Sequence, residues 1–303
     1  MEKVIEIGNL VKEYRGLRAV DGIDLYVKEG EIYSLLGPNG AGKTTTVEIL
    51  EGIRRKTSGE ISVLGLDPVK NKKDLSRRIG ILPQDFNFMA NITPIEALKF
   101  YKRCLGSKTD VIQLLKEVDL YDKRDTPFEN MSGGQKQKLG LAMAMSSEPQ
   151  ILFLDEPTAG LDPFSRRNVW SVIQRMKETG RTVFLTTHYL DEAEKLSDRV
   201  AFIKDGKIVS EGSPDEIVRL NHRGDRVILR SESDIMSILE ILGYDVSSEN
   251  GTVQVVIKDS TEFFEIVDLL KEKKIELTDV TMKRESLEDV FMRLVGKVDD
   301  NEP

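Results

Sequence analysis

The feature that most constrains this chain is the glycine-rich segment Gly37–Thr44, which reads Gly-Pro-Asn-Gly-Ala-Gly-Lys-Thr. The segment fits the pattern G-x-x-x-x-G-K-S/T, and it joins a stretch typical of a strand, Glu31–Leu36, to a helical stretch, Lys43–Leu50. Glycines let the backbone curl until several N–H groups point at one phosphate, and the helix N-terminus adds partial positive charge. The lysine would contact the β- and γ-phosphates, and Thr44 would place a hydroxyl on Mg²⁺. We therefore predict a phosphate-binding loop. The alternative, a glycine-rich turn beside a surface lysine, does not explain the strand and helix on either side.

Two acidic residues, Asp155 and Glu156, follow the apolar stretch Ile151–Leu154, which is typical of a parallel strand buried on both faces. Open α/β sheets bind their ligands at the C-terminal ends of such strands. We therefore expect Asp155 to hold Mg²⁺ and Glu156 to accept a proton from a water that attacks the γ-phosphate. On its own the acidic pair could simply end a strand, but beside a phosphate loop this interpretation is the weaker one.

Two further polar residues lie at the ends of predicted strands. His188 follows the stretch Thr182–Thr187, where a neutral imidazole could form a hydrogen bond to the γ-phosphate or to the attacking water. Gln84 follows Ile81-Leu82-Pro83, and its side-chain amide could reach the metal. A single histidine is more often structural, and the glutamine indicates nothing by itself, so both assignments depend on the phosphate loop.

A second anion site is indicated by the tetrapeptide Ser132–Gln135, Ser-Gly-Gly-Gln, which ordinary composition makes rare. A hydroxyl and two glycines at the start of a helix repeat the physics of the phosphate loop. The alternative is that Ser132 simply caps the helix that carries Leu139, Ala142 and Met143. Because the two interpretations are compatible, we keep both.

Local start and stop signals outline the rest of the chain up to about residue 215. Thr93–Glu96 is a capping box with proline at the first helical position, and helical patterning continues to about residue 146. Asp162-Pro163 opens another helix, and Asp205-Gly206 predicts a hairpin. One apolar stripe runs along the helix after Pro163: Val169, Val172, Ile173 and Met176. Further predicted strands are Val4–Ile7, Leu25–Val27 and Arg199–Ile203.

The character of the sequence changes at about residue 222. Five stretches read as strand, helix, strand, helix and strand: Val227–Arg230, Ile235–Leu242, Thr252–Ile257, Phe263–Leu270 and Ile275–Val280. Asn250-Gly251 supplies a turn before the middle strand. We therefore predict a first domain over residues 1–220, with a helical subdomain over about 86–148. A small α+β domain over 222–298 and an acidic tail over 299–303 follow.

Composition excludes several other classes of protein. The chain has 44 Lys and Arg against 52 Asp and Glu, a net charge of −8, which disfavours a nucleic-acid partner. Its single cysteine, Cys104, cannot form an intrachain disulfide, and we expect it to be a small buried apolar residue. No apolar run approaches the about 20 residues that span a bilayer, and the N-terminal segment lacks the pattern of a signal peptide. We therefore expect a soluble, cytoplasmic protein that binds no nucleic acid.

With these motifs in this order, the chain resembles the ATP-binding cassette (ABC) ATPases over about residues 1–220. The resemblance implies an α/β fold of the P-loop NTPase class. It has a RecA-like mixed sheet, an antiparallel β edge and a helical insertion, followed here by the small α+β C-terminal domain. Met131 and Gly160 depart from the commonest residues of the family, but neither change removes a phosphate contact or a carboxylate.

The resemblance also implies ATP hydrolysis and assigns roles to residues. The catalytic residues would be Glu156, His188 and Lys43. The Mg²⁺ ligands would be Thr44, Gln84 and Asp155. Two chains would pair head to tail, as a homodimer or pseudo-dimer, so that each ATP lies between the phosphate loop of one chain and the Ser132–Gln135 segment of the other. Tyr14 would stack on the adenine. The ATP contacts implied are Tyr14, Gly37, Pro38, Asn39, Gly40, Ala41, Gly42, Lys43, Thr44, Thr45, Ser132, Gly133, Gly134 and Gln135.

The segments Leu287–Phe291 and Thr187–Glu194 resemble the drug-resistance-type branch of ABC exporters, although Leu287–Phe291 could also be an ordinary amphipathic helix. Members of that branch work with a separate polytopic membrane permease, so the resemblance implies a subunit that lies on the inner face of the cell membrane. The alternative is a soluble ABC ATPase that acts without a permease on a nucleic-acid, ribosomal or scaffold partner. A single cassette without a long coiled-coil insertion favours the exporter.

Overall fold

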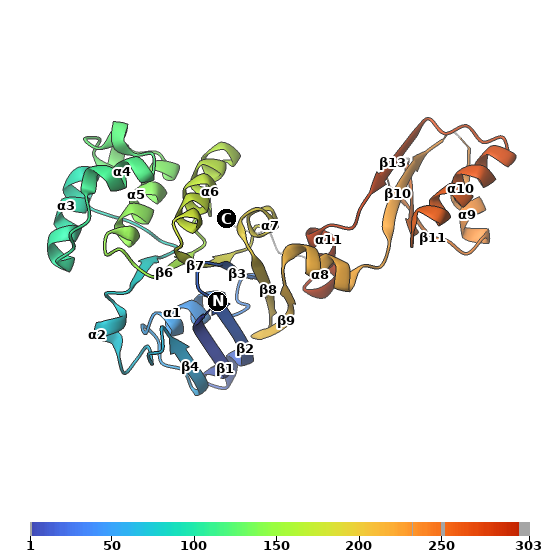
Figure 1. The fold of residues 1–303 in the computed structure, drawn as a ribbon. Helices are drawn as coiled ribbons and strands as arrows, with labels where there is room; N and C mark the ends of the chain where they lie inside the picture. Colours follow the sequence, from blue (N-terminus) through green and yellow to red (C-terminus); the bar gives the residue numbers. More distant parts are fainter. Residues whose placement is uncertain (1, 232, 250–251, 297–303) are drawn as a thin grey trace. The chain divides into compact units, whose positions relative to one another are not determined.

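The computed structural model describes residues 2–231, 233–249 and 252–296, and the chain forms two compact units (Figure 1). The first unit runs to Pro214 and includes the chain again from Leu294, and the second unit is Asp215–Arg293. The division therefore lies inside helix α8 (Pro214–Asn221), before the boundary at residues 220–222 expected from the sequence. The sequence boundary was placed where a new strand pattern begins, and that pattern begins only after α8 ends at Asn221.

A six-stranded sheet with the order β5-β6-β7-β3-β8-β9 forms the centre of the first unit. All neighbouring pairs are parallel except β8 and β9, which are antiparallel. The strands are β3 (Ile32–Leu36), β5 (Ile79–Leu82), β6 (Ile151–Asp155), β7 (Thr182–Thr187), β8 (Arg199–Lys204) and β9 (Lys207–Gly212). Strands β3, β6 and β7 are buried at every position, as predicted for parallel strands covered on both faces. The hairpin predicted at Asp205-Gly206 is confirmed, with φ of 48° and 77° at these residues.

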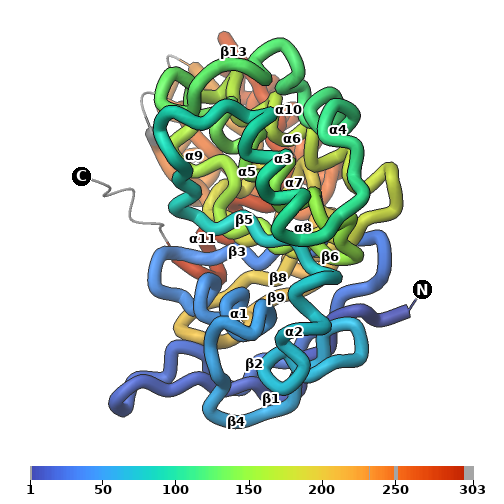
Figure 2. Tube along the Cα trace, turned by 90° about the vertical axis from the view of Figure 1, so that its left-hand side faces the viewer, coloured from blue at the N-terminus to red at the C-terminus, as the bar shows by residue number. Residues whose placement is uncertain are grey.

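A three-stranded antiparallel sheet with the order β2-β1-β4 forms the β edge of the unit. Its strands are β1 (Lys3–Tyr14), β2 (Leu17–Lys28) and β4 (Ser58–Val63). The predicted strands Val4–Ile7 and Leu25–Val27 are parts of β1 and β2, which are longer. The two strands stay paired through several register shifts, from Lys3 opposite Lys28 to Tyr14 opposite Leu17. Helix α1 (Lys43–Leu50) lies between this sheet and the central sheet (Figures 1 and 2). Its Leu50 shares one apolar cluster with Ile5 of β1 and Tyr33 of β3.

The predicted helical insertion lies between β5 and β6 in the chain, on the side of the central sheet opposite to β1, β2 and β4 (Figure 2). Its helices are α3 (Pro94–Leu105), α4 (Val111–Glu117) and α5 (Gly133–Met145), and the short α2 (Lys72–Leu75) precedes β5. The capping box predicted at Thr93 is confirmed, because the Thr93 N–H donates to Glu96 Oε2 at 3.0 Å.

The helices that follow β6 and β7 are α6 (Pro163–Glu178) and α7 (Leu190–Leu196). Asp162 caps α6, since its Oδ1 accepts from the N–H groups of Phe164 and Ser165, each at 3.0 Å. The predicted apolar stripe is confirmed, because its four members are all buried: Val169, Val172, Ile173 and Met176.

The second unit has a four-stranded antiparallel sheet with the order β11-β12-β10-β13, and one apolar cluster joins the sheet to α9 and α10. Its other elements are β10 (Asp225–Arg230), α9 (Ile235–Ile241), β11 (Asp245–Glu249), β12 (Thr252–Ile257), α10 (Ser260–Glu272), β13 (Asp279–Lys283) and α11 (Leu287–Leu294). The last predicted strand, Ile275–Val280, is present but shifted along the chain: β13 begins at Asp279, and Ile275 and Leu277 pack against this cluster from the segment before it. Strand β11 was not predicted, and the turn predicted at Asn250-Gly251 lies outside the described residues.

The expectation that Cys104 is buried is wrong. The thiol is exposed near the end of α3, because Ala97 and Leu98 carry the buried face of that helix. Among the described residues, no helix combines the length and the apolar character that crossing a membrane requires.

Candidate functional site

The predicted phosphate loop follows β3 at the C-terminal edge of the central sheet, and its backbone packs closely on two neighbouring segments. A Cβ atom at Gly37 would lie 2.3 Å from the Ile203 carbonyl oxygen, and one at Gly42 would lie 2.3 Å from the Ala19 carbonyl oxygen. Gly40 and Gly42 also have positive φ, 79° and 107°, which other residues adopt only with strain. Glycine is therefore required at these positions by space or by conformation.

Lys43, the first residue of α1, holds its ammonium group against this loop. The side chain is only 5% exposed, and its Nζ donates to the carbonyl oxygens of Gly37 at 2.8 Å and Pro38 at 3.3 Å. The same Nζ lies 3.2 Å from Glu156 Oε1. One buried cation thus joins the end of β3 to the end of β6.

Glu156 is fixed by both its backbone and its side chain. Its N–H donates to the backbone oxygen and to Oγ1 of Thr186, each at 3.1 Å, and its φ of 47° lies in the left-handed region. Its Oε2 lies 2.8 Å from His188 Nδ1. Burial works to raise the pKa of Glu156, but the hydrogen bond with His188 and the charge of Lys43 outweigh it, so the pKa lies below its usual value. The carboxylate is therefore ionised and points at the phosphate loop.

Asp155, the last residue of β6, is in a different electrostatic state. Burial raises the pKa of Asp155, and the neighbouring Glu156 adds to this effect. The hydroxyls of Thr186 and Thr44 oppose the shift by hydrogen bonding to the carboxylate. The Thr44 interaction joins Asp155 to the start of α1, as the predicted metal site requires.

A pocket of about 280 Å³ opens over the loop and gathers residues from three of the predicted motifs. It is lined by Pro38, Asn39, Gly40, Gly42, Lys43, Thr44, Thr45, Gln84 and Glu156. Among the described residues, no group of three or more His, Cys, Asp and Glu side chains is arranged to hold a metal ion. The pocket combines the backbone of the phosphate loop, the Lys43 ammonium group and one carboxylate, Glu156.

The Ser132–Gln135 segment does not line this pocket. Ser132 caps α5 in a capping box: its Oγ accepts from the Gln135 N–H at 3.3 Å, and its N–H donates to Gln135 Oε1 at 3.0 Å. A Cβ atom at Gly133 would lie 3.0 Å from Leu161 Cδ2, and one at Gly134 would lie 3.0 Å from Ser165 Cβ. The glycines therefore let the start of α5 contact the start of α6.

Tyr14 lies at the end of β1 and is also absent from the residues that line the pocket. Its ring is contacted by the Lys12 ammonium, 4.7 Å from the ring centroid, and by the Arg54 guanidinium at 5.4 Å. Its hydroxyl is buried without a hydrogen-bond partner among the described residues. The stacking of Tyr14 on adenine stays a prediction.

Sequence reasoning missed the polar residues behind the site. Glu192 on α7 is fully buried, and its Oε1 accepts from Thr158 Oγ1 and Trp170 Nε1, both at 2.8 Å. Burial raises the pKa of this carboxyl group. The signal available in the sequence was the position of Glu192 close after His188, but its partners lie far away in the chain and no periodicity indicates them.

A second buried carboxyl group, Glu51, lies at the C-terminal end of α1. Only 7% of the residue is exposed. Burial, together with the negative charges of Asp155 and Glu48, raises the pKa of Glu51 from 4.5 to about 8. The folded protein therefore holds a proton on Glu51 near neutral pH.

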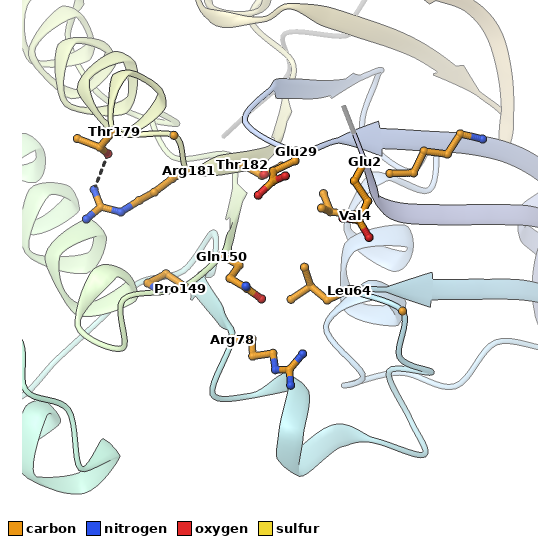
Figure 3. A pocket seen from close by; sticks show the side chains of 13 residues that line it. Glu2, Val4, Glu29, Leu64, Arg78, Pro149, Gln150, Thr179, Arg181 and Thr182 are labelled. Carbon is orange, nitrogen blue, oxygen red and sulfur yellow. Dashed lines mark hydrogen bonds between the residues drawn. The ribbon is translucent and has the colours of Figure 1, made fainter.

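Another cavity, of about 440 Å³, lies at the opposite edge of the central sheet (Figure 3). Gln150 and Thr182, at the N-terminal ends of β6 and β7, line it together with Glu29 and Arg78. None of the predicted site residues contributes to it. Ligands of such sheets bind at the C-terminal ends of the strands, so the candidate site is the smaller pocket at the phosphate loop.

The fold and this pocket together define a P-loop ATPase. The family model described as ABC transporter matches residues 20–159. The chain is 35% identical to a daunorubicin resistance ATP-binding protein of Streptomyces coeruleorubidus over 97% of this chain and 96% of that protein. It is 34% identical to the bacitracin transport ATP-binding protein of Bacillus licheniformis over 98% of each.

Among solved structures, the chain is similar to a dimeric ATP-binding cassette in a post-hydrolysis state bound to ADP and Pi. The TM-score is 0.61 at 26% identity, over 69% of this chain and 98% of that one. The chain therefore belongs to the ABC transporter family, as an ATP-binding subunit with ATPase activity. This confirms the fold class and the family expected from the sequence.

We predict that Glu51→Gln changes how stability depends on pH. In the wild type, the native Glu51 keeps its proton up to about pH 8, whereas the unfolded chain loses it near pH 4.5, so the free energy of unfolding falls as pH rises between these values. The variant cannot titrate, and its stability relative to the wild type should rise over this range by an amount on the order of a few kcal/mol.

The measurement is urea unfolding of both proteins between pH 4.5 and 8.5. Glu178→Gln, at an exposed position on α6, is the matched control and should show no such rise. A constant difference between wild type and Glu51→Gln across this range would contradict the assignment.

Proposed function

We propose that this chain powers an exporter by binding and hydrolysing ATP in a head-to-tail dimer attached to a polytopic membrane permease. The observation that carries the proposal is the separation of two anion-binding motifs in one chain. The phosphate loop lines a pocket together with the Glu156 carboxylate, whereas Ser132–Gln135 lies outside that pocket, at the start of α5. A second chain that presents its α5 to the pocket would give both motifs a role at one ATP.

In this proposal, the loop N–H groups and the start of α1 bind the phosphates of ATP. Lys43 contacts the β- and γ-phosphates, whose oxygens compete with the loop carbonyls and with Glu156 for the ammonium group. Thr45 and Asn39 line the same pocket, and Tyr14 stacks on the adenine. The closed dimer adds Ser132 and Gly134 of the second chain.

The residues present fit one Mg²⁺ ion. Thr44 and Asp155 already interact, and Gln84 lines the pocket, so a hydroxyl, a carboxylate and an amide oxygen are available as ligands. A single protein carboxylate suits Mg²⁺, which keeps several waters and binds substrate phosphates. When bound, the ion would neutralise charge on the β- and γ-phosphates.

Hydrolysis in this proposal is a proton transfer coupled to phosphoryl transfer. A water oxygen attacks the γ-phosphorus and gives its proton to the Glu156 carboxylate, while the bond from that phosphorus to the oxygen of ADP breaks. The lowered pKa of Glu156 keeps the carboxylate ready to accept at neutral pH. His188 holds the same carboxylate at 2.8 Å and orients it.

Export is supported by the relatives, two of which are named for drug resistance and for bacitracin transport and match this chain over nearly its full length. The cargo would be bound by the permease, so this chain does not itself identify it. The helical insertion, together with Gln84, would pass the opening and closing of the dimer to that partner. The chain would then lie on the inner face of the cell membrane.

We predict that Glu156→Gln keeps ATP binding and slows hydrolysis on the order of 10²–10⁴-fold, because the amide cannot accept the proton. Single-turnover hydrolysis and nucleotide binding are measured on the same preparation. Glu178→Gln serves as the exposed control and should match the wild type. Wild-type turnover in Glu156→Gln would remove this residue from the role of base.

We predict that Ser132→Arg, placed in the Glu156→Gln background, leaves ATP binding by the monomer intact but abolishes ATP-driven dimerisation. The bulky cation would occupy the space expected for the partner's phosphates. Dimerisation is measured by light scattering with and without ATP.

Because Ser132 also caps α5, the matched control is Asp110→Ala, which removes the cap of α4. That control should still dimerise. ATP-dependent dimers of the Ser132→Arg protein would show that the shared site is wrong.

We predict that the Glu156→Gln chain, isolated with ATP from detergent-solubilised membranes of its own cells, carries a polytopic membrane protein in a fixed ratio. An untagged strain is the control. Recovery with ribosomes or DNA in place of a membrane protein would favour the permease-free alternative.

A further inference from the structure

Strand β13 is an open edge of the sheet in the second unit. Among the described residues, the strand order β11-β12-β10-β13 leaves one side of β13 without a neighbouring strand, and all five of its residues are exposed. An open edge presents unpaired backbone N–H and C=O groups, which can pair with another strand.

The sequence of β13, Asp-Val-Thr-Met-Lys, is self-complementary when it pairs with itself in the antiparallel sense. With Thr281 opposite Thr281 of a second copy, Asp279 lies opposite Lys283, and Val280 lies opposite Met282. Opposite charges and apolar pairs at directly opposed positions both stabilise a sheet.

The faces of the sheet also agree with this register. Val280 and Met282 lie opposite Leu229 and Val227 of β10, on the face that packs against the helices of the unit. Their partners on β10 are fully buried, but Val280 is 40% and Met282 is 43% exposed. A second copy of β13 would bring two more apolar side chains to this face and cover part of that exposed area.

The charged residues lie on the other face, where Asp279 lies opposite Arg230 of β10. Among the described residues, neither Asp279 nor Lys283 forms an ion pair within 4.0 Å. Lys283 lies opposite Arg226, a like charge whose guanidinium is paired with Asp289 at 3.0 Å. A second copy would give each Lys283 a carboxylate, Asp279, at the directly opposed position. The charges therefore select both the antiparallel direction and the register.

We propose that β13 is a two-fold interface through which the second unit of one chain pairs with the same unit of a second copy, forming a continuous eight-stranded sheet. The proposal goes beyond the proposed function, because this pairing requires neither nucleotide nor the phosphate loop. It assigns residues 279–283 to a weak contact between two chains, which cross-linking captures without nucleotide and which adds to the ATP-driven contact at the phosphate loops. Such an interface is isologous, as the commonest protein dimers are.

The test is disulfide cross-linking of the full chain at Thr281→Cys, after Cys104→Ser has removed the only native thiol. In the proposed register the two Thr281 Cα atoms lie about 4.5–5.5 Å apart, which a disulfide can bridge. Ser247→Cys, at an exposed position in the middle of the other edge strand, β11, is the matched control.

Both proteins are oxidised without nucleotide, and the rate of covalent dimer formation is followed on non-reducing gels. Thr281→Cys should cross-link at least about tenfold faster than Ser247→Cys, because pairing raises the local concentration of the partner thiol. Equal rates, or a faster Ser247→Cys reaction, would overturn the proposal.

A charge exchange tests the register. Adding Asp279→Lys to the Thr281→Cys protein opposes two lysines at each end of the pair and should slow cross-linking. Adding Lys283→Asp as well restores opposite charges and should restore the rate. If the double exchange does not recover cross-linking, the proposed register is wrong.

ATP hydrolysis by all these variants, and ATP-driven dimerisation in the Glu156→Gln background, are measured in parallel. The substitutions lie outside the ATP pocket, so hydrolysis should stay at the wild-type level. If Thr281→Cys cross-links no faster than Ser247→Cys while ATP-driven dimerisation is normal, the β13 interface alone is overturned. Loss of ATP-driven dimerisation with normal cross-linking would instead contradict the head-to-tail dimer.

Discussion

The close approach of the phosphate loop to its neighbours is the constraint on which the rest of the site depends. Gly37 lies against the Ile203 carbonyl and Gly42 against the Ala19 carbonyl, so a side chain at position 37 would push the loop off β8 and one at position 42 would push it off the start of β2. The position of the loop then sets where α1 begins, and the start of α1 sets where Lys43 and Thr44 meet the residues at the end of β6. A central sheet and a β edge are both required to hold one loop in place.

The carboxyl groups around α1 show how the protein assigns different charges to similar side chains. Glu156 has a cation and an imidazole as partners, and its pKa falls. Asp155 has mainly hydroxyl partners and a carboxylate neighbour, and its pKa rises. Glu51 is buried near two other acidic groups, Asp155 and Glu48, and no cation offsets them. Its pKa therefore rises furthest of the three, to about 8. The hydrogen bond with His188 and the charge of Lys43 therefore distinguish Glu156 from the two carboxyl groups whose pKa rises.

Features with a local cause could be predicted from the sequence, and features with a distant partner could not. The capping box at Thr93 and the apolar stripe of α6 depend on residues within a few positions of each other, and both are present. The buried Glu192 depends on hydroxyl and indole donors far away in the chain, so no pattern indicated it. Ile275 lies in a loop and packs against the apolar cluster of the second unit. An apolar loop residue of this kind looks the same in the sequence as a residue of a strand.

The contact between the starts of α5 and α6 has a consequence for how such a chain can vary. Gly133 and Gly134 leave only 3.0 Å between an added Cβ and the side chains of Leu161 and Ser165. A larger residue at position 133 or 134 therefore fits only where the facing side chain moves by a few tenths of an ångström or becomes smaller. In descendants of this sequence, position 133 should therefore vary in concert with position 161, and position 134 with position 165, although two stretches of chain encode each pair.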